Sequence, residues 1–264
     1  MPGNLDRRNY YGYTGVPNVC VDGVYVNVSD SYAQYRLRFD ERKVIPSPIA
    51  LSVTLQDYDN STGVGHVRAV ATNMSGATGF AYLRFVAVGD DTVGTWGGFS
   101  YLSHTALHVF PNGLGVAASL PPNGIFETTQ EFQIPTSWRH KPCTIIAFAQ
   151  RDDTKEVLQA TILHEVVLGL SSELQAGQLV LDWPGISGAT LYRVHGTVNG
   201  PYFVPAPGNL VATLPAGTTT WSTPAGIGDP ATNWTYRVIA LDASSDVLTM
   251  SGRSGEFDFS VDAR

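Results

Sequence analysis

From Ile49 onward, apolar and polar residues alternate along the chain in short runs. Successive side chains of a β-strand point to opposite faces of a sheet, so these runs predict strands with one buried face. Asp-Asn, Ser-Gly, Asp-Asp and Asn-Gly pairs separate the runs, as turn residues do. The clearest runs read IALSVTLQDYD, GVGHVRAVATN, GFAYLRFVAVGDD, IFETTQEFQIP and CTIIAFAQRDDTKEVLQATILHEV. The pattern predicts a mostly β chain built as an antiparallel β-sandwich.

Helical periodicity is concentrated in residues 29–43. A serine that can cap a helix comes first, apolar or aromatic residues follow at spacings of three and four, and charged residues close the segment. These features predict a helix. The periodic positions are Tyr32, Tyr35, Leu37 and Phe39. Because the rest of the chain has almost no helical periodicity, we expect no second helix.

The stretch YYGYTGVPNVCVDG, residues 10–23, predicts a hairpin. It contains a glycine-ended aromatic run, the pair Val16-Pro17 and the short apolar strand NVCV, and Asp22-Gly23 closes it. Apolar strands bounded by such turn residues are typical of β-hairpins. We therefore expect a hairpin followed by a helix in residues 1–45.

The length of 264 residues is too great for one ordinary sandwich and suits two domains. Two prolines in VIPSPIALSV precede the first alternating strand, as in an entry linker, and place a boundary near Pro46. The small and polar stretch GLSSELQAGQ, residues 169–178, places a second boundary. The predicted division is therefore a hairpin and helix over 1–45, a sandwich over 46–170 and a second sandwich over 171–264.

The second sandwich must bury alternate residues of its strands, and Trp183 is the expected anchor of its core. The expected core positions are Leu179, Leu181, Trp183, Tyr192, Val194, Tyr236, Val238 and Ala240. The order L-x-W, A-T-x-Y-R-V and Y-R-V-I-A resembles the fibronectin type III family. The resemblance implies a fibronectin type III-like sandwich in which Y-R-V-I-A-L is strand F.

Three pieces of the middle part resemble the outer membrane protein twenty-eight family of bacterial envelope proteins. They are PSPIALSV, LSHTALHVFPNGLGV and FQIPTSWRHKPCTIIAFAQRDDTKEVLQA, in this order. In that family a thioredoxin-like part precedes an immunoglobulin-like sandwich, and the junction carries a YYGVTGVPT run that leads to VDG and a helix. The resemblance implies that residues 10–23 are the last hairpin of a thioredoxin-like fold. It also implies that residues 46–170 are the immunoglobulin-like sandwich.

Residues 1–45 differ from a complete thioredoxin-like fold. The first half of that fold is not in the sequence, no CxxC pair occurs, and Asn18 stands where the family has threonine. Val16-Pro17 takes the place of the cis-proline of that fold, and the sequence leaves its isomer open. A lone hairpin and helix bury too little surface to fold alone. We therefore expect this remnant to pack on the sandwich, on another chain or on a piece removed from this one.

The chain has a net charge of −7, and only 15% of its residues are charged. The basic clustering is limited to Arg36, Arg38, Arg42 and Lys43, which predicts no nucleic-acid partner. No apolar run reaches the roughly 18 residues of a membrane helix, and no signal peptide is visible. The sequence therefore leaves open a cytosolic chain or one whose leader lies outside it. The family resemblance favours an extracellular or cell-surface location.

Two polar groups could bind a metal, and each has a simpler structural interpretation. His104 and His108 have the spacing of helical metal ligands, but they lie next to alternating strands and outside an H-E-x-x-H frame. Asp57, Asp59 and Asn60 could hold calcium, but a hairpin turn accounts for them. We predict no metal site.

Catalytic groups are equally hard to assign. Asp90-Asp91 and Asp152-Asp153 could act as paired carboxylates, but both pairs lie between strands where turn residues are needed. No G-x-S-x-G elbow or glycine-rich phosphate loop is present, and no nucleophile has an assignable base. We predict that the chain is not an enzyme and has no cofactor.

Cys20 and Cys143 lie on different predicted strands. A disulfide between them and two buried free thiols both remain open, and their apolar surroundings favour free thiols. A redox role would require an exposed Cys20 with a lowered pKa. Glycosylation frames, which matter only on a glycosylating secretory route, occur at Asn27, Asn60, Asn73 and Asn233.

Aromatic residues provide the candidate contact surface. Exposed tyrosine and tryptophan bring large apolar area into an interface at little entropic cost. The predicted interface residues are Tyr10, Tyr11, Tyr13, Tyr25, Tyr32, Tyr35, Trp96, Phe99 and Tyr101. We therefore expect association with a protein partner or with further copies of the chain.

These observations predict a non-enzymatic structural or adhesive protein of a bacterial cell surface or extracellular assembly. If copies join head to tail through the N-terminal segment, the product is a fibre. The alternative is a carbohydrate- or peptide-binding accessory module of a larger surface protein or enzyme. That alternative predicts an exposed aromatic strip in a monomer, such as Trp96 with Tyr101 or Trp221 with Trp234.

Overall fold

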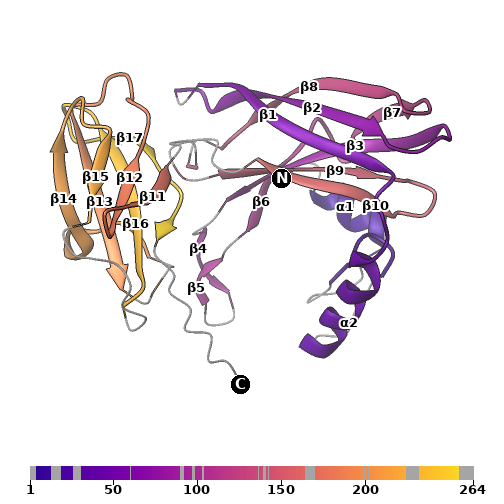
Figure 1. Ribbon diagram of the computed structural model, residues 1–264, viewed down its shortest axis with the longest axis horizontal. Helices are drawn as coiled ribbons and strands as arrows, with labels where there is room; N and C mark the ends of the chain where they lie inside the picture. Colours follow the sequence, from indigo (N-terminus) through magenta and orange to yellow (C-terminus); the bar gives the residue numbers. More distant parts are fainter. Residues whose placement is uncertain are drawn as a thin grey trace.

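The computed structural model of the chain is shown in Figure 1. It describes residues 4–12, 19–25, 31–59, 61–89, 92–96, 99–102, 104–135, 137–138, 141, 143–163, 170–198, 200, 203–223 and 232–255. The described residues lie mostly in antiparallel β-strands, which confirms the mostly β fold that the alternation predicts.

The first sandwich contains two antiparallel sheets. Its strands are β1 (Ile49–Asp59), β2 (Val64–Asn73), β3 (Gly79–Gly89), β6 (Thr105–Phe110), β7 (Val116–Leu120), β8 (Ile125–Gln133), β9 (Cys143–Gln150) and β10 (Val157–Leu163). One sheet has the order β1-β2-β8, and the other has the order β10-β9-β3-β6 with β7 also paired to β3. The five alternating runs of the sequence coincide with β1, β2, β3, β8 and the β9–β10 hairpin, so these strand predictions are confirmed.

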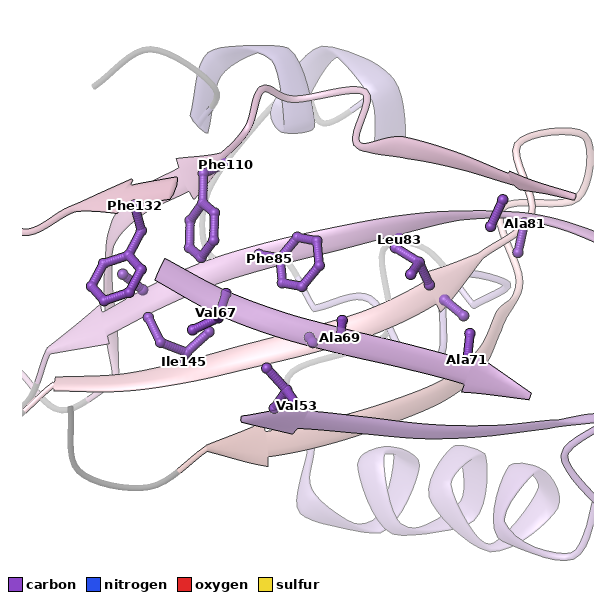
Figure 2. Close-up of a cluster of buried hydrophobic side chains, with 14 of the residues drawn as sticks. Val53, Val67, Ala69, Ala71, Ala81, Leu83, Phe85, Phe110, Phe132 and Ile145 are labelled. Carbon is purple, nitrogen blue, oxygen red and sulfur yellow. The ribbon is translucent and has the colours of Figure 1, made fainter. Parts of the chain in front are cut away.

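The inner faces of the two sheets enclose an apolar core, shown in Figure 2. Alternation along β3 places Leu83 and Phe85 in this core with at most 1% of each exposed. The ring of Phe85 stacks on Phe110, with centroids 5.3 Å apart, and Phe110 lies 5.7 Å from Phe132. Burial of a side chain of this kind contributes about 1.5–3 kcal/mol. The core therefore gives the sheets a rigid frame, and their outer faces remain available for other contacts.

The second sandwich has a core of its own. Its strands are β11 (Ser171–Gln175), β12 (Gln178–Asp182), β13 (Leu191–Val198), β14 (Leu210–Pro215), β15 (Thr220–Ser222), β16 (Trp234–Leu241), β17 (Val247–Met250) and β18 (Ser254–Gly255), with a 3₁₀ turn at Pro207–Asn209. One sheet has the order β11-β12-β15, and the other has the order β14-β13-β16-β17 with β18 also paired to β16. All eight core positions expected from the sequence are buried in one cluster.

Trp183 anchors this second core as expected. It is 3% exposed, and its ring lies 5.6 Å from that of Tyr192. The Tyr192 hydroxyl accepts a hydrogen bond of 2.9 Å from the backbone N–H of Ile186. The polar end of a buried tyrosine is thus satisfied, as such groups normally are.

The connection between β3 and β6 forms a small hairpin of β4 (Thr92–Trp96) and β5 (Phe99–Leu102). The structure describes the backbone of these strands, and their side chains lie outside the description. Trp96, Phe99 and Tyr101 are therefore placed on a hairpin, and their role in an interface stays a prediction.

Two helices precede the first sandwich, α1 (Asn4–Tyr11) and α2 (Tyr32–Lys43). The helix expected over residues 29–43 is confirmed, and Ser31 is its cap, because the Ser31 hydroxyl accepts from the N–H of Gln34 at 3.3 Å. The prediction that the chain has no second helix is wrong, because residues 4–11 form α1. The strand expected at residues 10 and 11 is also wrong, because both residues belong to this helix.

Gly12 explains the error at the start of the chain. Its φ of 71° is the left-handed conformation that commonly ends a helix. A glycine directly after Tyr10-Tyr11 fits the end of a helix as well as the end of a strand. Residues 13–18 lie outside the described residues, and with them the Val16-Pro17 pair and Tyr13. The cis peptide that the described residues contain joins Phe110 to Pro111.

The expected Asp22-Gly23 turn is present between Val21 and Tyr25. The backbones of these two residues exchange hydrogen bonds of 2.9 and 3.1 Å. Asp22 and Gly23 have φ values of 54° and 77°. A Cβ at Gly23 would lie 1.7 Å from the carbonyl oxygen of Lys155, so this turn fits against the β9–β10 hairpin only with glycine.

Candidate interaction surface

α1 packs on the outer face of the sheet that contains β3 and β9 (Figure 1). Because Ala147 and Ala149 face the core, Phe148 and Gln150 point to the other side of β9. The Arg7 guanidinium lies 5.7 Å from the Phe148 ring centroid and donates to Gln150 Oε1 at 2.6 Å. One arginine of α1 thus joins the helix to β9 by stacking and by hydrogen bonding.

Arg7 also organises α1 itself. It donates to the Tyr11 hydroxyl at 2.7 Å, and its guanidinium lies 4.3 Å from the centroid of Tyr10 and 4.8 Å from that of Tyr11. Burial under these rings lowers the pKa of Arg7 from its ordinary value. The side chain remains a cation held between aromatic faces, a favourable arrangement for arginine.

Arg84 of β3 lies beneath α1 and is completely buried. Its guanidinium donates to Gln150 Oε1 at 3.1 Å and forms an ion pair with Asp152 in the β9–β10 turn. It also stacks between two aromatic rings, with centroid distances of 5.1 Å to Tyr10 and 5.3 Å to Tyr82. α1 therefore covers a charge that the sheet alone would leave exposed on its outer face.

Tyr10 contacts both arginines of this cluster through its ring. Its hydroxyl donates to Asp152 Oδ1 at 2.9 Å. Burial, followed by this hydrogen bond to an anion, raises the pKa of Tyr10 to about 12. We call the set formed by Arg7, Tyr10, Arg84, Gln150 and Asp152 the α1 anchor. It fixes α1 to its own sandwich through one carboxylate and two arginines.

The Val21–Tyr25 turn docks beside the α1 anchor. Gln150 Nε2 donates to the Tyr11 hydroxyl at 2.8 Å and to the Lys155 carbonyl at 2.5 Å. The N–H of Val157, at the start of β10, donates to the Asp22 carbonyl at 3.0 Å. The turn thus makes one backbone hydrogen bond to the edge of β10, as the first residue of an added strand would.

α2 is joined to this region mainly through Arg42 near its C-terminal end. Arg42 Nε donates to Asp22 Oδ2 at 2.6 Å, and its Nη2 forms an ion pair with Glu156. The hydrogen bond to Glu156 is the main cause that raises the pKa of Arg42. At the other contact, the Arg38 guanidinium lies 4.6 Å from the Tyr25 ring centroid. Among the described residues, polar contacts and one stacking contact therefore join α2 to the rest of the chain, and no residue of α2 is buried.

The remaining surface of α2 is apolar in part. Tyr32, Leu37 and Phe39 are exposed by 77%, 45% and 60%. The helix also contains four basic and two acidic residues, whereas the rest of the chain contains 12 basic and 21 acidic residues. α2 therefore presents large apolar side chains, while Asp22 and Glu156, which pair with Arg42, offset its two surplus cations.

The predicted interface residues separate into groups. Tyr10 and Tyr11 contact the sandwich of their own chain, and Tyr25 lies under Arg38. Tyr32 is exposed on α2, and Tyr35 is half-buried on the same helix. Tyr32 is thus the tyrosine of this group most available to a partner, and an interface role for all of them stays a prediction.

The paired tryptophans of the alternative hypothesis are half-buried in the second sandwich. Trp221 lies 5.4 Å from Tyr236, and Trp234 stacks on the same ring at 5.6 Å. Packing against a core tyrosine occupies one side of each indole. These residues therefore form part of the core edge, and they are not free-standing rings.

The metal and carboxylate candidates have structural partners where they are described. Asp59 accepts hydrogen bonds from the backbone N–H and the hydroxyl of Ser61, both at 2.7 Å, as in a capped turn. Asp57 contacts His66 Nδ1 at 2.7 Å, and Asp153 pairs with Arg151 at 2.6 Å. Asn60, Asp90 and Asp91 lie outside the described residues.

His104 and His108 do not share a helix. His108 lies in the middle of β6, and its Nδ1 accepts from the N–H of Gln133 at 3.3 Å, while His104 precedes the strand with a φ of 54°. Across the described ranges, no group of three or more His, Cys, Asp or Glu side chains is placed to share a metal ion. Cys20 is half-buried, Cys143 is buried, and the two do not form a disulfide with each other.

Among the described residues, no helix combines the length and the apolar composition that a bilayer crossing requires.

Arg7, Arg84 and Gln150 were not predicted as functional residues from the sequence. Arg84 had a visible signal, because it is the one charge within the apolar run FAYLRFVAV. A charge on a strand of this kind is either solvated or covered by a polar partner. Arg7 and Gln150 had no comparable signal, since their contact joins segments 143 residues apart.

No family model matches the sequence, and no curated protein matches it. Among solved structures, HBP35 of Porphyromonas gingivalis matches with a TM-score of 0.49 and 13% identity, over 97% of this chain and 80% of that one. Pectate lyase PelI from Erwinia chrysanthemi matches with a TM-score of 0.27 and 16% identity, over 33% and 27% of the two chains. Red sea bream transglutaminase matches with a TM-score of 0.32 and 11% identity, over 86% and 34%. Similarities at this level assign neither a family nor an activity to the chain.

Proposed function

We propose that this chain is a non-enzymatic structural protein of a bacterial cell surface or extracellular assembly, and that copies of it associate through α2. We further propose that its first sandwich is immunoglobulin-like, its second is fibronectin type III-like, and residues 1–45 are the end of a thioredoxin-like fold. The sequence patterns described above support these assignments.

The proposal rests on the exposed apolar side chains of α2. A helix of 12 residues is marginal in water unless an apolar face packs on something. α2 has three large exposed apolar side chains and no buried one, yet Arg42 ties it to the sandwich. An anchored helix with an uncovered apolar side is well suited to contact another protein, because the partner gains apolar burial without having to order the helix.

The partner we propose is a second copy, and the exposed apolar side chains of α2 are the basis of that proposal. Charge contributes little, because the two surplus cations of α2 are offset by Asp22 and Glu156, which pair with Arg42. Contact of α2 with a different surface of the next copy is heterologous, and repetition of such a contact gives an open fibre.

Light scattering after size exclusion, over a range of concentrations, tests this proposal. The account predicts a mass above that of one chain that rises with concentration, and fibres or short oligomers in negative-stain images. A compact monomer at the highest concentration would rule self-association out.

A substitution that places a negative charge on the exposed apolar side of α2 tests directly whether α2 is the contact. Phe39→Glu should keep the chain monomeric, because Phe39 is 60% exposed and its loss affects no core. The matched control is Leu174→Glu on β11, where a leucine is 64% exposed in the second sandwich. The proposal requires the control to associate as the unmodified chain does.

A second function, recognition of a carbohydrate, is favoured by one groove at the end of the first sandwich. The groove has a volume of 670 Å³, and Phe80, Tyr82, Ser119, Asp152 and Asp153 are among its lining residues. Phe80 is 53% exposed and lies 5.3 Å from the Tyr82 ring. An aromatic face beside carboxylates and hydroxyls suits a sugar ring. Calorimetry with a panel of oligosaccharides, compared with Phe80→Ala, tests it, and heats that Phe80→Ala leaves unchanged would reject it.

A further inference from the structure

A groove of 560 Å³ runs along the edge of β10. Its lining includes five consecutive residues, 156–160, the linker residues 45–48, and Phe39 and Lys43 of α2. A groove lined by consecutive residues of a strand offers that strand's edge to an extended peptide.

β10 is an edge strand, so its outer backbone groups are available. Its sheet has the order β10-β9-β3-β6, and β9 is its partner within that sheet. Two backbone N–H groups on the outer edge of β10 form hydrogen bonds, but not with a neighbouring strand. The N–H of Val157 donates to the Asp22 carbonyl, and the N–H of Ala160 donates to the side-chain Oε1 of the adjacent residue Gln159 at 3.0 Å. A side-chain cap of this kind can be exchanged for the carbonyl of an added strand.

Side chains around the groove select what kind of strand would bind. Phe39 and Ile45 are exposed by 60% and 49%, and Leu158, which also lines the groove, is half-buried. Three cations, Arg42, Lys43 and Arg151, and two carboxylates, Asp22 and Glu156, also line the groove. Lys43 and Arg151 pair with Asp40 and Asp153, and 52% and 45% of their side chains stay exposed to a further acidic group. The groove therefore suits a strand that alternates apolar with acidic residues.

Residues 256–264 of the same sequence have this pattern. They read EFDFSVDAR, with Phe257, Phe259 and Val261 on one side of an extended chain and Glu256 and Asp258 on the other. This segment follows β18 directly, and β18 pairs its last residue, Gly255, with Thr235 of β16.

We propose that the β10 groove binds residues 256–264 of a second copy as an added strand. This proposal rests on the proposed self-association, in which the β10 groove of one copy would contact residues 256–264 of another. The N-terminal side of one molecule receives a segment of the next, so each contact leaves one groove and one segment unused. The assembly is then linear.

A labelled peptide with the sequence of residues 252–264 tests the binding step by fluorescence anisotropy. The receptor is the full chain with Phe257→Asp and Phe259→Asp, so that its own segment does not compete. We expect saturable binding, which weakens as salt is added because exposed charges contribute. A peptide of the same composition with its apolar residues made contiguous should not bind. Equal binding of that peptide, or no binding of the native one, would overturn the inference.

Two variants locate the site on the receptor. Ala160→Pro removes the outward N–H without removing a ladder bond to β9, and it should weaken binding about tenfold, while Ala160→Val should not. Lys43→Glu should weaken binding by reversing a charge at the groove, whereas Arg36→Glu, on α2 but outside the groove, should not. The Lys43 pair keeps the test valid if Ala160→Pro folds poorly. Unchanged binding to both Ala160→Pro and Lys43→Glu would place the peptide elsewhere and overturn the inference.

Light scattering separates this inference from the proposed function. If the unmodified chain associates and the Phe257→Asp, Phe259→Asp chain is monomeric, both stand. If both chains associate equally, the segment is not the occupant, and self-association stands without it. If the unmodified chain is a monomer but the peptide binds at the groove, the groove assignment stands and the proposed function fails.

Discussion

The α1 anchor shows how a buried charge is kept in a β-sandwich of this kind. Arg84 is completely buried, and its compensation comes from the Asp152 carboxylate, the Gln150 amide oxygen and two aromatic faces. Removal of one partner of a buried pair is costly, because the other charge then remains without compensation. The strength of this region should therefore depend on single residues.

Asp152→Asn should destabilise the first sandwich and loosen α1. Arg84 would keep its charge but lose its anionic partner, and because Asp152 itself is 36% exposed the cost is about 2 kcal/mol, below the roughly 3–5 kcal/mol of a fully buried pair. The neighbouring Asp153→Asn is the matched control, because the pair of Asp153 with Arg151 is largely exposed and such pairs contribute little. Chemical denaturation of the two variants measures the difference. Equal stability of the two variants would show that the pair between Arg84 and Asp152 does not matter.

Tyr10 makes the anchor sensitive to alkaline pH. The folded state raises the pKa of Tyr10 from 10.0 to about 12, so it favours the neutral phenol. The stability that Tyr10 contributes is therefore fully present below about pH 10 and is lost as pH rises toward 12. A difference titration of phenolate absorbance between the unmodified chain and Tyr10→Phe should show one phenol that ionises near pH 12. A midpoint near pH 10 would contradict this placement of the hydroxyl.

Among the elements, the two helices depend on anchors more than on a core. α1 is short, and α2 buries no residue, so α2 is not stabilised in the usual way by an inward apolar face. Arg7 and Arg42 instead connect them to the β9–β10 hairpin. This hairpin is the element on which the N-terminal segment is assembled.

Arg42→Gln should release α2 without unfolding the sandwich. The variant loses the ion pairs to Asp22 and Glu156, and we expect amide exchange in α2 to become faster by about tenfold. The melting temperature should change little, since no core residue is involved. Arg36→Gln is the control, because its pair with Asp40 lies within α2 and is exposed. If exchange in α2 were the same in both variants, Arg42 would not be its anchor.

The sequence predicts the strands well because alternation and turn residues are local signals. β1 and the core set around Trp183 follow from these signals directly. α1 could not be predicted in this way, because its apolar residues are few and its stability comes from contacts with β3 and β9. The β10 groove depends on the spatial approach of residues 45–48 to 156–160, which no local pattern reports.

At the scale of the whole molecule, each of the two sandwiches has an apolar core, and no described residue of the N-terminal segment, 1–45, belongs to either core. α1 and the Val21–Tyr25 turn are fixed on the first sandwich, whereas α2 and the β10 groove keep apolar surface exposed. In the N-terminal segment, α1 and the Val21–Tyr25 turn therefore complete their own molecule, and we propose that α2 contacts the next copy.

Hydrogen exchange measured at a low and a high protein concentration tests this division most directly. The account predicts that amides of α1 and of the Val21–Tyr25 turn are equally protected at both concentrations. It also predicts that amides of α2 and of the outer edge of β10 become more protected as concentration rises. Exchange of α2 and β10 that is the same at both concentrations would contradict the account.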